Sequence, residues 1–380
     1  MREAVIVEAV RTPLGRGKPG GVLSEVHPVD LLAHALKEVV GRAGVDPLQL
    51  DDVIAGCVSQ VGEQGINVGR NAVLAAGFPV EVPATSVDRQ CGSSQQAIHF
   101  AAQGVQSGAY DIVVAAGVEV MSRVPMGASV QTGGMPFTKS IADRFNMVPQ
   151  GLSAEMIAEK WGVGREELDK IGYRSQTLAA RARDKGYFDR EIAPVATPGG
   201  EVKQDEGIRE SSLEKMATLK ASFKPEGGVV TAANSSQITD GASAVLITTP
   251  EKAEQLGLKP RARFHTFALA ASDPVIMLTA PIPATQKVLK RAGLTMDDIE
   301  VVEINEAFAS VLAAWQRELG LDPSETTEIT DNARVNPNGG AIALGHPLGA
   351  SGARLCTTLL HEMERRGAKY GLQTMCEGGG

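Results

Sequence analysis

The stretch CGSSQQAIHFAAQGVQSGAYDIVVAAG, residues 91–117, decides the fold class of this 380-residue chain. It opens with a helix-like segment rich in small residues, and the apolar residues 111–117 at its end are typical of a buried strand. The same arrangement returns near the end of the chain, where a helix-like segment at residues 349–367 leads to a further run at residues 372–376. Strands that alternate with helices predict an α/β fold with parallel sheets covered by helices.

A second pair of segments repeats in the same order. RAGV at residues 42–45 follows an amphipathic helix pattern and precedes DDVI at residues 51–54. RAGL at residues 291–294 also follows such a pattern and precedes DDI at residues 297–299. One matched pair could arise by chance, but two pairs in one order indicate an internal duplication.

Residues 121–227 match neither copy. They contain several Pro and Gly clusters and a charged helix-like segment at residues 153–184, for which Ser153 offers a capping residue. We interpret this region as an inserted loop domain that covers a site as a lid; a solvated excursion is the alternative. The two halves of the duplication are then residues 1–120 with 228–250, and residues 251–380.

Composition and charge exclude several function classes. The net charge of −8 argues against nucleic acid as a main partner. No apolar run approaches the roughly 18 residues that a membrane span requires, and neither an export signal nor a peroxisomal tripeptide is visible. These observations predict a cytoplasmic protein without a membrane span. No closely spaced Cys/His pair, GxGxxG or P-loop is present, so we expect no metal and no tightly bound cofactor.

Cys91 is the first candidate for chemistry. It follows an extended run and opens a helix, where unpaired N–H groups and the helix dipole lower a thiol pKa and favour the nucleophilic thiolate. A buried structural cysteine is the alternative. The four cysteines are far apart, and without an export signal we expect free thiols; Cys57 and Cys356 are interpreted as small buried hydrophobic residues.

Three further candidates lie in the second half. His346 stands between Gly and Pro just before a helix start, and a neutral imidazole there could accept a proton from Cys91. Cys376 ends a strand and precedes glycines, a place where ligands bind in α/β sheets. Asn305 lies between two glutamates after a strand and could position water or an imidazole. The alternatives are a structural histidine, a tail that ends on a buried cysteine, and simple helix capping.

Together these pieces resemble the thiolase family. The resemblance implies a duplicated five-layer α/β/α/β/α fold with an inserted loop domain, and an acyltransferase that uses coenzyme A as a substrate. The matching stretches, in family order along the chain, are residues 8–13, 88–94, 117–122, 233–236, 240–242, 305–308, 336–340, 345–347 and 376–379.

The resemblance also implies a ping-pong reaction. Cys91 would be the nucleophile, His346 its base, and Cys376 the acid and base that acts on acetyl-CoA and CoA. His346 and a water held by Asn305 would form one oxyanion hole, and the backbone N–H groups of Cys91 and Gly378 the other. Coenzyme A contacts would include Ser236. Lys220, with Lys203, Arg209, Lys215 and Lys224 of the inserted region, could meet the phosphates of coenzyme A. Homodimers or homotetramers are expected.

The sequence departs from the family pattern at three places. Gln237 stands where many members have Gly after the serine, which puts close backbone approach there in doubt. Family chains continue past the glycines into one last strand, whereas this sequence ends at Gly380; we therefore expect an unpaired sheet edge and a less certain Gly378 donor. Short-chain members carry Met-Gly in the inserted loop, and here Gln150 precedes Gly151.

The last departure favours a degradative 3-ketoacyl-CoA thiolase, as in β-oxidation of fatty acids or related acyl chains. The biosynthetic acetoacetyl-CoA thiolase, an acetyl-CoA C-acetyltransferase, is the alternative. A decarboxylating ketoacyl synthase would lack the second cysteine, and a non-catalytic lipid-binding relative would lose the nucleophile. A Cys–His hydrolase would release free acid instead of acyl-CoA.

Overall fold

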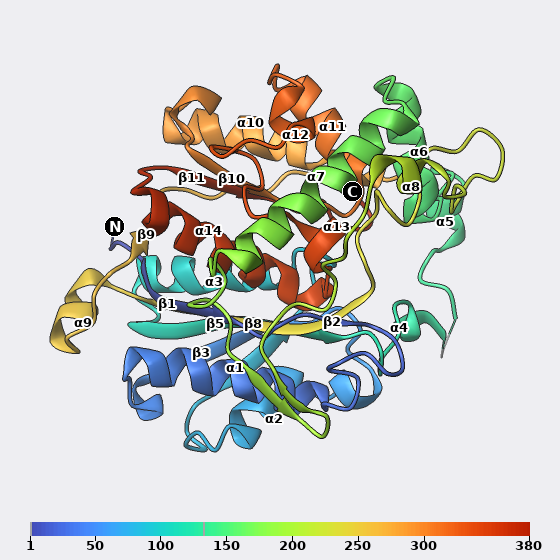
Figure 1. Ribbon diagram of the computed structural model, residues 1–380. Helices are drawn as coiled ribbons and strands as arrows, with labels where there is room; N and C mark the ends of the chain where they lie inside the picture. The colour runs from blue at the N-terminus through green and yellow to red at the C-terminus, as the bar shows by residue number, and fades with distance from the viewer. Residues whose placement is uncertain (1, 132–133) are drawn as a thin grey trace.

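The computed structural model describes residues 2–131 and 134–380. Residues 132–133, which belong to the predicted inserted region, and residue 1 lie outside the described residues. The chain forms five layers, which Figure 1 shows from bottom to top. These layers are α1 (Pro28–Ala43) with α2 (Val68–Ala75), a seven-stranded sheet, α3 (Ser93–Ser107) with α14 (Ser351–Arg366), the pair β10 (Val301–Ile304) and β11 (Gly371–Thr374), and α10 (Pro281–Ala292) with α11 (Ala309–Glu318).

The seven-stranded sheet is mixed, so the prediction of parallel sheets was wrong for part of it. β3 pairs in parallel with both β4 and β5, whereas β8 runs antiparallel to β5 and β1. The difference arises because the chain leaves β5 for the inserted region and returns along β8 in the opposite direction. The strand order is β4 (Ala84–Val87), β3 (Asp52–Gly56), β5 (Ile112–Val120), β8 (Thr239–Thr248), β1 (Val5–Arg11) and β9 (Ala262–Arg263), and β2 (Gly15–Arg16) pairs with β8.

The duplicated sequence segments adopt matching backbone conformations. α1 ends at Gly44 with φ 69° and ψ 28°, and α10 ends at Gly293 with φ 67° and ψ 28°. Both glycines are left-handed helix caps, and each is followed by a short 3₁₀ turn and then a strand. α3 and α14 likewise end at left-handed glycines, Gly108 and Gly367. The two halves thus repeat one helix–turn–strand unit.

Three apolar clusters hold the layers together. One lies between α1, α2 and the lower face of the seven-stranded sheet, and a second joins its upper face to α3 and α14. A third surrounds β10 and β11 and includes the fully buried Trp315 of α11. The middle layer is therefore buried on both sides, which explains the small residues that the sequence places in α3.

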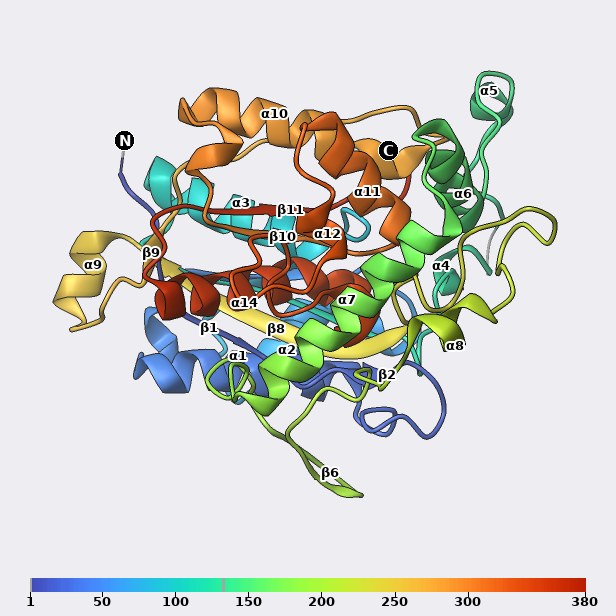
Figure 2. The ribbon, with the colours of Figure 1, turned by 45° about the horizontal axis from the view of Figure 1, so that its top comes forward.

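The inserted region forms α4 (Ala128–Gln131), α5 (Lys139–Ala142), α6 (Gln150–Lys160), α7 (Arg165–Asp184), the hairpin β6–β7 (Val195–Thr197, Gly200–Val202) and α8 (Leu213–Ala217). Figure 2 shows α7 running diagonally past α11 and α13 (Ala341–Leu344), while the β6–β7 hairpin projects away from the body. The predicted cap at Ser153 was wrong, because α6 begins earlier and buries Ser153 inside it. Glu155 instead accepts the backbone N–H groups of Val229 and Val230. The remaining helices are α9 (Pro250–Gln255) and α12 (Ser324–Thr327).

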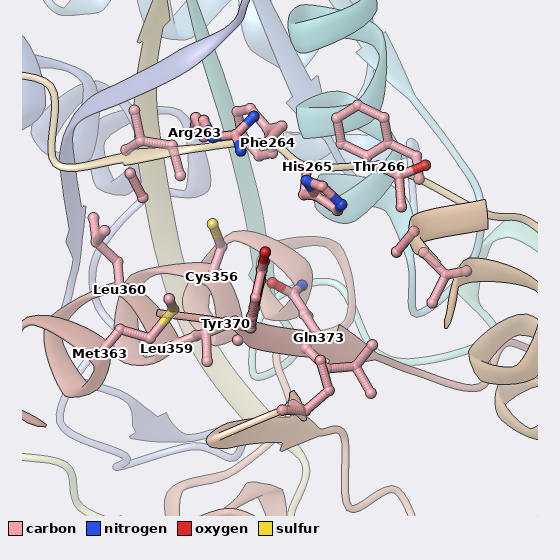
Figure 3. Close-up of a pocket in the computed structure, with 18 of the residues that line it drawn as sticks. Arg263, Phe264, His265, Thr266, Cys356, Leu359, Leu360, Met363, Tyr370 and Gln373 are labelled. Carbon is pink, nitrogen blue, oxygen red and sulfur yellow. The ribbon is translucent and has the colours of Figure 1, made fainter. Parts of the chain in front are cut away.

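The second sheet has an open edge. Within the described residues β11 pairs with β10 alone, and its other side faces a groove of about 320 Å³. Figure 3 shows residues 263–266 on one wall of this groove and Cys356, Leu359 and Leu360 of α14 on another. Cys356 is buried there, as its interpretation as a small hydrophobic residue expects. None of the predicted catalytic residues lines this groove.

The cap at the end of α1 gives a direct stability test. Gly44 has left-handed φ and Gly41 lies within the helix, and a Cβ atom at either position meets nothing within 4 Å. Gly44→Ala is therefore expected to lower the free energy of unfolding by about 1 kcal/mol through backbone strain. Gly41→Ala, its matched control three residues away, is expected to raise it by about 0.5–1 kcal/mol. Urea unfolding measures both, and equal shifts of one sign would contradict the cap.

Candidate active site

Cys91 lies at the turn that leads into α3. Gly92 is the N-cap of the helix, and Gln90 has a left-handed φ of 45°, a strained conformation for a residue with a side chain. Cys91 is buried, with 4% of its surface exposed. The backbone N–H groups of Gly378 and of Cys91 itself, the two donors predicted for an oxyanion hole, lie close enough to its sulfur to lower its pKa. The turn thus places a thiol against preorganised N–H groups.

The loop that carries His346 is fixed by hydrogen bonds from β8 and the segment before it. The backbone N–H of His346 donates to Thr239 Oγ1 at 3.0 Å and to the Gln237 carbonyl at 3.2 Å. The Gln237 side chain in turn donates to the carbonyls of Gly207, Ile342 and Ala343. Gln237, a departure from the family pattern, therefore links the inserted region to the segment just before this loop.

Asn305 and Cys376 complete the set of predicted catalytic side chains. Asn305 Nδ2 lies 3.3 Å from His346 Nε2, and the backbone N–H of Asn305 donates to the Thr374 carbonyl at 3.1 Å. Among the described residues the buried Asn305 Oδ1 has no hydrogen-bond partner, which leaves an acceptor for a water or a ligand. Cys376 is fully buried and close enough to Cys91 that the charge of a Cys91 thiolate raises the pKa of Cys376.

Glycines allow the Cys91 turn and the His346 loop to meet; we call Gly56, Gly117 and Gly349 the glycine junction. A Cβ atom at Gly117 would lie 2.2 Å from the Gly349 carbonyl oxygen, and one at Gly56 would lie 2.3 Å from the Ser94 nitrogen. These contacts admit no side chain. Leu348 of the His346 loop packs with Cys91 in one apolar cluster.

Glu119 of β5, to which the sequence assigned no role, anchors the junction. Its buried carboxylate accepts the backbone N–H groups of Val58, Ser59 and Gly349 at 2.9–3.1 Å, together with the Gln64 side chain. Burial raises its pKa, and the four donors oppose that rise. The signal in the sequence that could have identified it is a glutamate near the end of an apolar strand-like run, just before the MS dipeptide of residues 121–122.

Burial dominates the electrostatics of the site. It raises the pKa of Cys91 to about 12, with a further rise from the nearby Glu377, and it raises the pKa of Cys376 well above its usual value. The low Cys91 pKa predicted from the helix N-terminus was therefore wrong for the free site, because desolvation outweighs the N–H groups. Burial, with the charge of Arg354, lowers the pKa of His346 to about 3. The free site thus holds neutral thiols and a neutral imidazole.

The glutamates that flank Asn305 do not cap a helix. Glu306 accepts hydrogen bonds from Ser175 of α7 and from Asn336, and so ties the inserted region to the second half. Glu303 faces Arg354 of α14 at 3.6 Å, and burial raises its pKa to about 8. α11 begins only at Ala309, beyond both carboxylates. The capping alternative is therefore wrong.

The predicted coenzyme A contacts differ in burial. Ser236 is half-buried and donates its backbone N–H to the Ala307 carbonyl, next to Asn305. Lys220 is exposed, and it does not line the cavity of about 230 Å³ beside α8. Arg209 and Lys215, two other cations of the inserted region, do line it. The structure thus sets two positive charges beside a cavity between the inserted region and residues 232–233.

Comparisons with known proteins settle the family. The thiolase N-terminal domain model matches residues 4–251, and the thiolase C-terminal domain model matches residues 258–380. The chain belongs to the thiolase family. It is therefore an acyltransferase of the thiolase type, and the predicted α/β thiolase fold is confirmed.

Two curated relatives and one solved structure illustrate the similarity. A steroid 3-ketoacyl-CoA thiolase of Mycobacterium tuberculosis is 51% identical over the whole chain and 92% of its own length. A β-ketoadipyl-CoA thiolase of Acinetobacter baylyi is 46% identical over the whole chain and 98% of its own length. The crystal structure of an acetyl-CoA acetyltransferase of Bacillus anthracis superposes with a TM-score of 0.89 at 38% identity, covering 100% of this chain and 97% of that one.

Glu377 gives this thiolase a testable pH dependence. Burial raises the pKa of Glu377 to about 7, and its ionised carboxylate raises the pKa of Cys91. Glu377→Gln is therefore expected to speed alkylation of Cys91 by iodoacetamide roughly 3–10-fold above about pH 8, and to change it little below about pH 6 where the carboxyl is protonated. Peptide mapping at each pH measures the rate.

The control is Glu251→Gln, an exposed glutamate in the first turn of α9, which Figure 1 shows at the far end of the molecule. It is expected to leave the Cys91 profile unchanged. Identical profiles for Glu377→Gln and the parent protein would show that this carboxylate does not act on the thiol.

Proposed function

We propose that this chain is an acyl-CoA:acetyl-CoA C-acyltransferase that cleaves 3-ketoacyl-CoA with coenzyme A, giving acetyl-CoA and an acyl-CoA shortened by two carbons. The observation that carries the proposal is the Cys91 sulfur, which receives the Gly378 N–H and neighbours the Cys376 thiol. His346, which contacts Asn305, lies on the loop whose Leu348 packs with Cys91. This reaction requires a nucleophile, a base, an acid and two sets of oxyanion donors.

In the first half-reaction the Cys91 proton passes to His346 Nε2 as the sulfur attacks the 3-keto carbon. The bond between C2 and C3 then breaks, which leaves acyl-Cys91 and the enolate of acetyl-CoA. The Cys376 thiol protonates the enolate carbon and becomes a thiolate. The raised pKa of Cys91 and the lowered pKa of His346 favour a transfer that occurs during attack over a preformed ion pair.

In the second half-reaction the Cys376 thiolate takes the proton of an incoming CoA thiol. The CoA sulfur attacks acyl-Cys91 and releases the shortened acyl-CoA. The Cys91 sulfur recovers its proton from the imidazolium of His346, so each proton returns to its starting group. Burial makes the Cys376 thiolate a strong base, which suits it to this step.

Two oxyanion holes lower the barriers. The N–H groups of Cys91 and Gly378 would hold the oxygen of the tetrahedral intermediates, and protonated His346 with a water on Asn305 would hold the enolate oxygen. Support comes from the Gly378 donor at the Cys91 sulfur and from the free Oδ1 of Asn305. Each such donor is worth about 3–4 kcal/mol in comparable enzymes.

The substrate proposal favours bulkier 3-ketoacyl chains over acetoacetyl-CoA. Gln150 of α6 and Gln90 lie near the Gly378 backbone, so polar, flexible side chains border the reacting centre. The relatives at 46–51% identity carry the names of 3-ketoacyl and β-ketoadipyl thiolases, which supports the degradative direction. The acetoacetyl-CoA thiolase remains the second candidate, because the solved acetyltransferase shares 38% identity and the whole fold.

The inserted region, residues 121–227, is proposed as the lid and coenzyme A domain between the halves at residues 1–120 with 228–250 and 251–380. Ser236, Lys220 and the two cations of the cavity beside α8, Arg209 and Lys215, would contact coenzyme A. Homodimers are proposed through the edge strand β4; Ile66 nearby is 93% exposed.

No helix in the described ranges is long and apolar enough to cross a bilayer. The cytoplasmic location stays a prediction.

The test follows the enolate absorbance of 3-ketoacyl-CoA across a chain-length series. Loss of absorbance is expected only when coenzyme A is present, with kcat/KM higher for longer chains than for acetoacetyl-CoA. Cys91→Ser is expected to lower kcat at least about 1000-fold, because the nucleophile is lost. Free acid as the product, or loss of absorbance without coenzyme A, would refute thiolysis.

A second variant tests the role of Cys376 as acid and base. Cys376→Ala is expected to block multiple turnover while acyl-Cys91 still forms slowly once, as measured by the mass of the intact chain. Cys356→Ala, a buried thiol on the groove beside β11, is the matched control and is expected to turn over normally. Full turnover in Cys376→Ala would end its assignment as acid and base.

A further inference from the structure

Ser351 contacts the imidazole of His346 from the first turn of α14. Its Oγ lies 2.5 Å from His346 Nδ1 and 2.9 Å from the Pro347 carbonyl oxygen. Both side chains are buried, with 1% of Ser351 and 4% of His346 exposed. The hydroxyl therefore bridges the ring and the backbone of the loop that carries it.

Counting protons decides the direction of both hydrogen bonds. A carbonyl oxygen only accepts, so the single hydroxyl proton of Ser351 is needed for the Pro347 contact. The Oγ atom is then left to accept at its other contact, and His346 Nδ1 must carry the proton. The reverse assignment would set the hydroxyl oxygen against the carbonyl oxygen without a proton between them.

The opposite side of the ring agrees with this assignment. Asn305 Nδ2 lies 3.3 Å from His346 Nε2, and an amide nitrogen only donates. With the amide in this orientation Nε2 accepts the hydrogen bond, which is compatible with the proton on Nδ1. Nε2 is the nitrogen to which the proposed reaction assigns the Cys91 proton.

We propose that Ser351 is a positioning residue that holds His346 in the neutral tautomer with the proton on Nδ1 and Nε2 free as the base. The expected effect on the acylation rate of Cys91 rests on the proposed function, but the expected tautomer of His346 does not. Without the Ser351 oxygen the buried Nδ1–H loses its acceptor, and the ring gains by moving the proton to Nε2. That tautomer cannot accept a proton from Cys91.

The experiment combines ¹⁵N NMR of the histidine rings with single-turnover acylation of Cys91 by 3-ketoacyl-CoA. The His346 signals are assigned by their loss in His346→Asn. In the parent protein Nδ1 is expected to be protonated and Nε2 bare. Ser351→Ala is expected to shift the proton toward Nε2 and to slow acylation roughly 10–100-fold, as for other partners that orient a functional imidazole, with KM little changed. Ser351→Thr keeps the oxygen and is expected to restore both signals and rate.

The matched control is Thr357→Val on the same helix. Thr357 Oγ1 is buried and donates to the Ala353 carbonyl at 2.8 Å, the same bond to a carbonyl four residues back that Ser351 makes, but its hydroxyl bonds no imidazole. It is expected to leave the tautomer and the acylation rate unchanged.

Three results would overturn the proposal: an Nε2 proton in the parent protein, an unchanged tautomer and rate in Ser351→Ala, or an equal loss of rate in Thr357→Val. If Ser351→Ala does not fold, the parent spectrum and Ser351→Thr still decide. Failure of thiolysis in the parent protein would refute the proposed function and would leave the tautomer measurement standing.

Discussion

The active site depends on one close backbone contact, the approach of the Gly349 carbonyl to Gly117 of β5. A Cβ atom at Gly117 would lie 2.2 Å from that oxygen, so no side chain fits. Gly349 also donates its N–H to Glu119 on the same strand at 2.9 Å. Together these contacts clamp the His346 loop of the second half onto the central sheet of the first, next to the turn that carries Cys91. The proposed reaction centre is thereby built from both duplicated halves.

The same contacts determine the protonation states of the site residues, because they bury the site. In a dry environment the thiols of Cys91 and Cys376 stay protonated and the imidazole of His346 stays neutral. None of these three groups is charged before substrate arrives, and the backbone N–H groups of Cys91 and Gly378 already lie beside the Cys91 sulfur. Catalysis then depends on proton transfers between fixed neighbours, which makes the orientation of His346 as important as its presence.

Much of the fold could be predicted from the sequence, because its signals are local. The glycines at residues 44 and 293 mark two matching left-handed helix ends, and the apolar run at residues 111–117 marks a buried strand. The direction of β8 could not be predicted, since it depends on where the inserted region returns the chain to the sheet. The start of α6 was missed because its N-cap, Pro149, offers no side-chain hydrogen bond.

For the candidate site, the sequence pointed to Cys91, His346, Asn305 and Cys376, and the structure places them in connected surroundings. The sequence led to a wrong prediction for the pKa of Cys91. A helix N-terminus can be recognised in the sequence, whereas desolvation depends on packing in three dimensions. The partners that hold the site, Glu119, Thr239 and Ser351, act through contacts between distant segments or through the geometry of a single helical turn.

The most direct test of the shared reaction centre is the single-turnover acylation of Cys91 in Gly117→Ala, with Gly164→Ala as the control. A Cβ atom at Gly164 meets nothing within 4 Å and the residue has an ordinary φ of −84°, so its acylation rate is expected to match the parent protein. Gly117→Ala must displace the Gly349 turn, and a shift of about 1 Å costs on the order of 100-fold in rate. A folded Gly117→Ala variant that forms acyl-Cys91 at the parent rate would contradict the account.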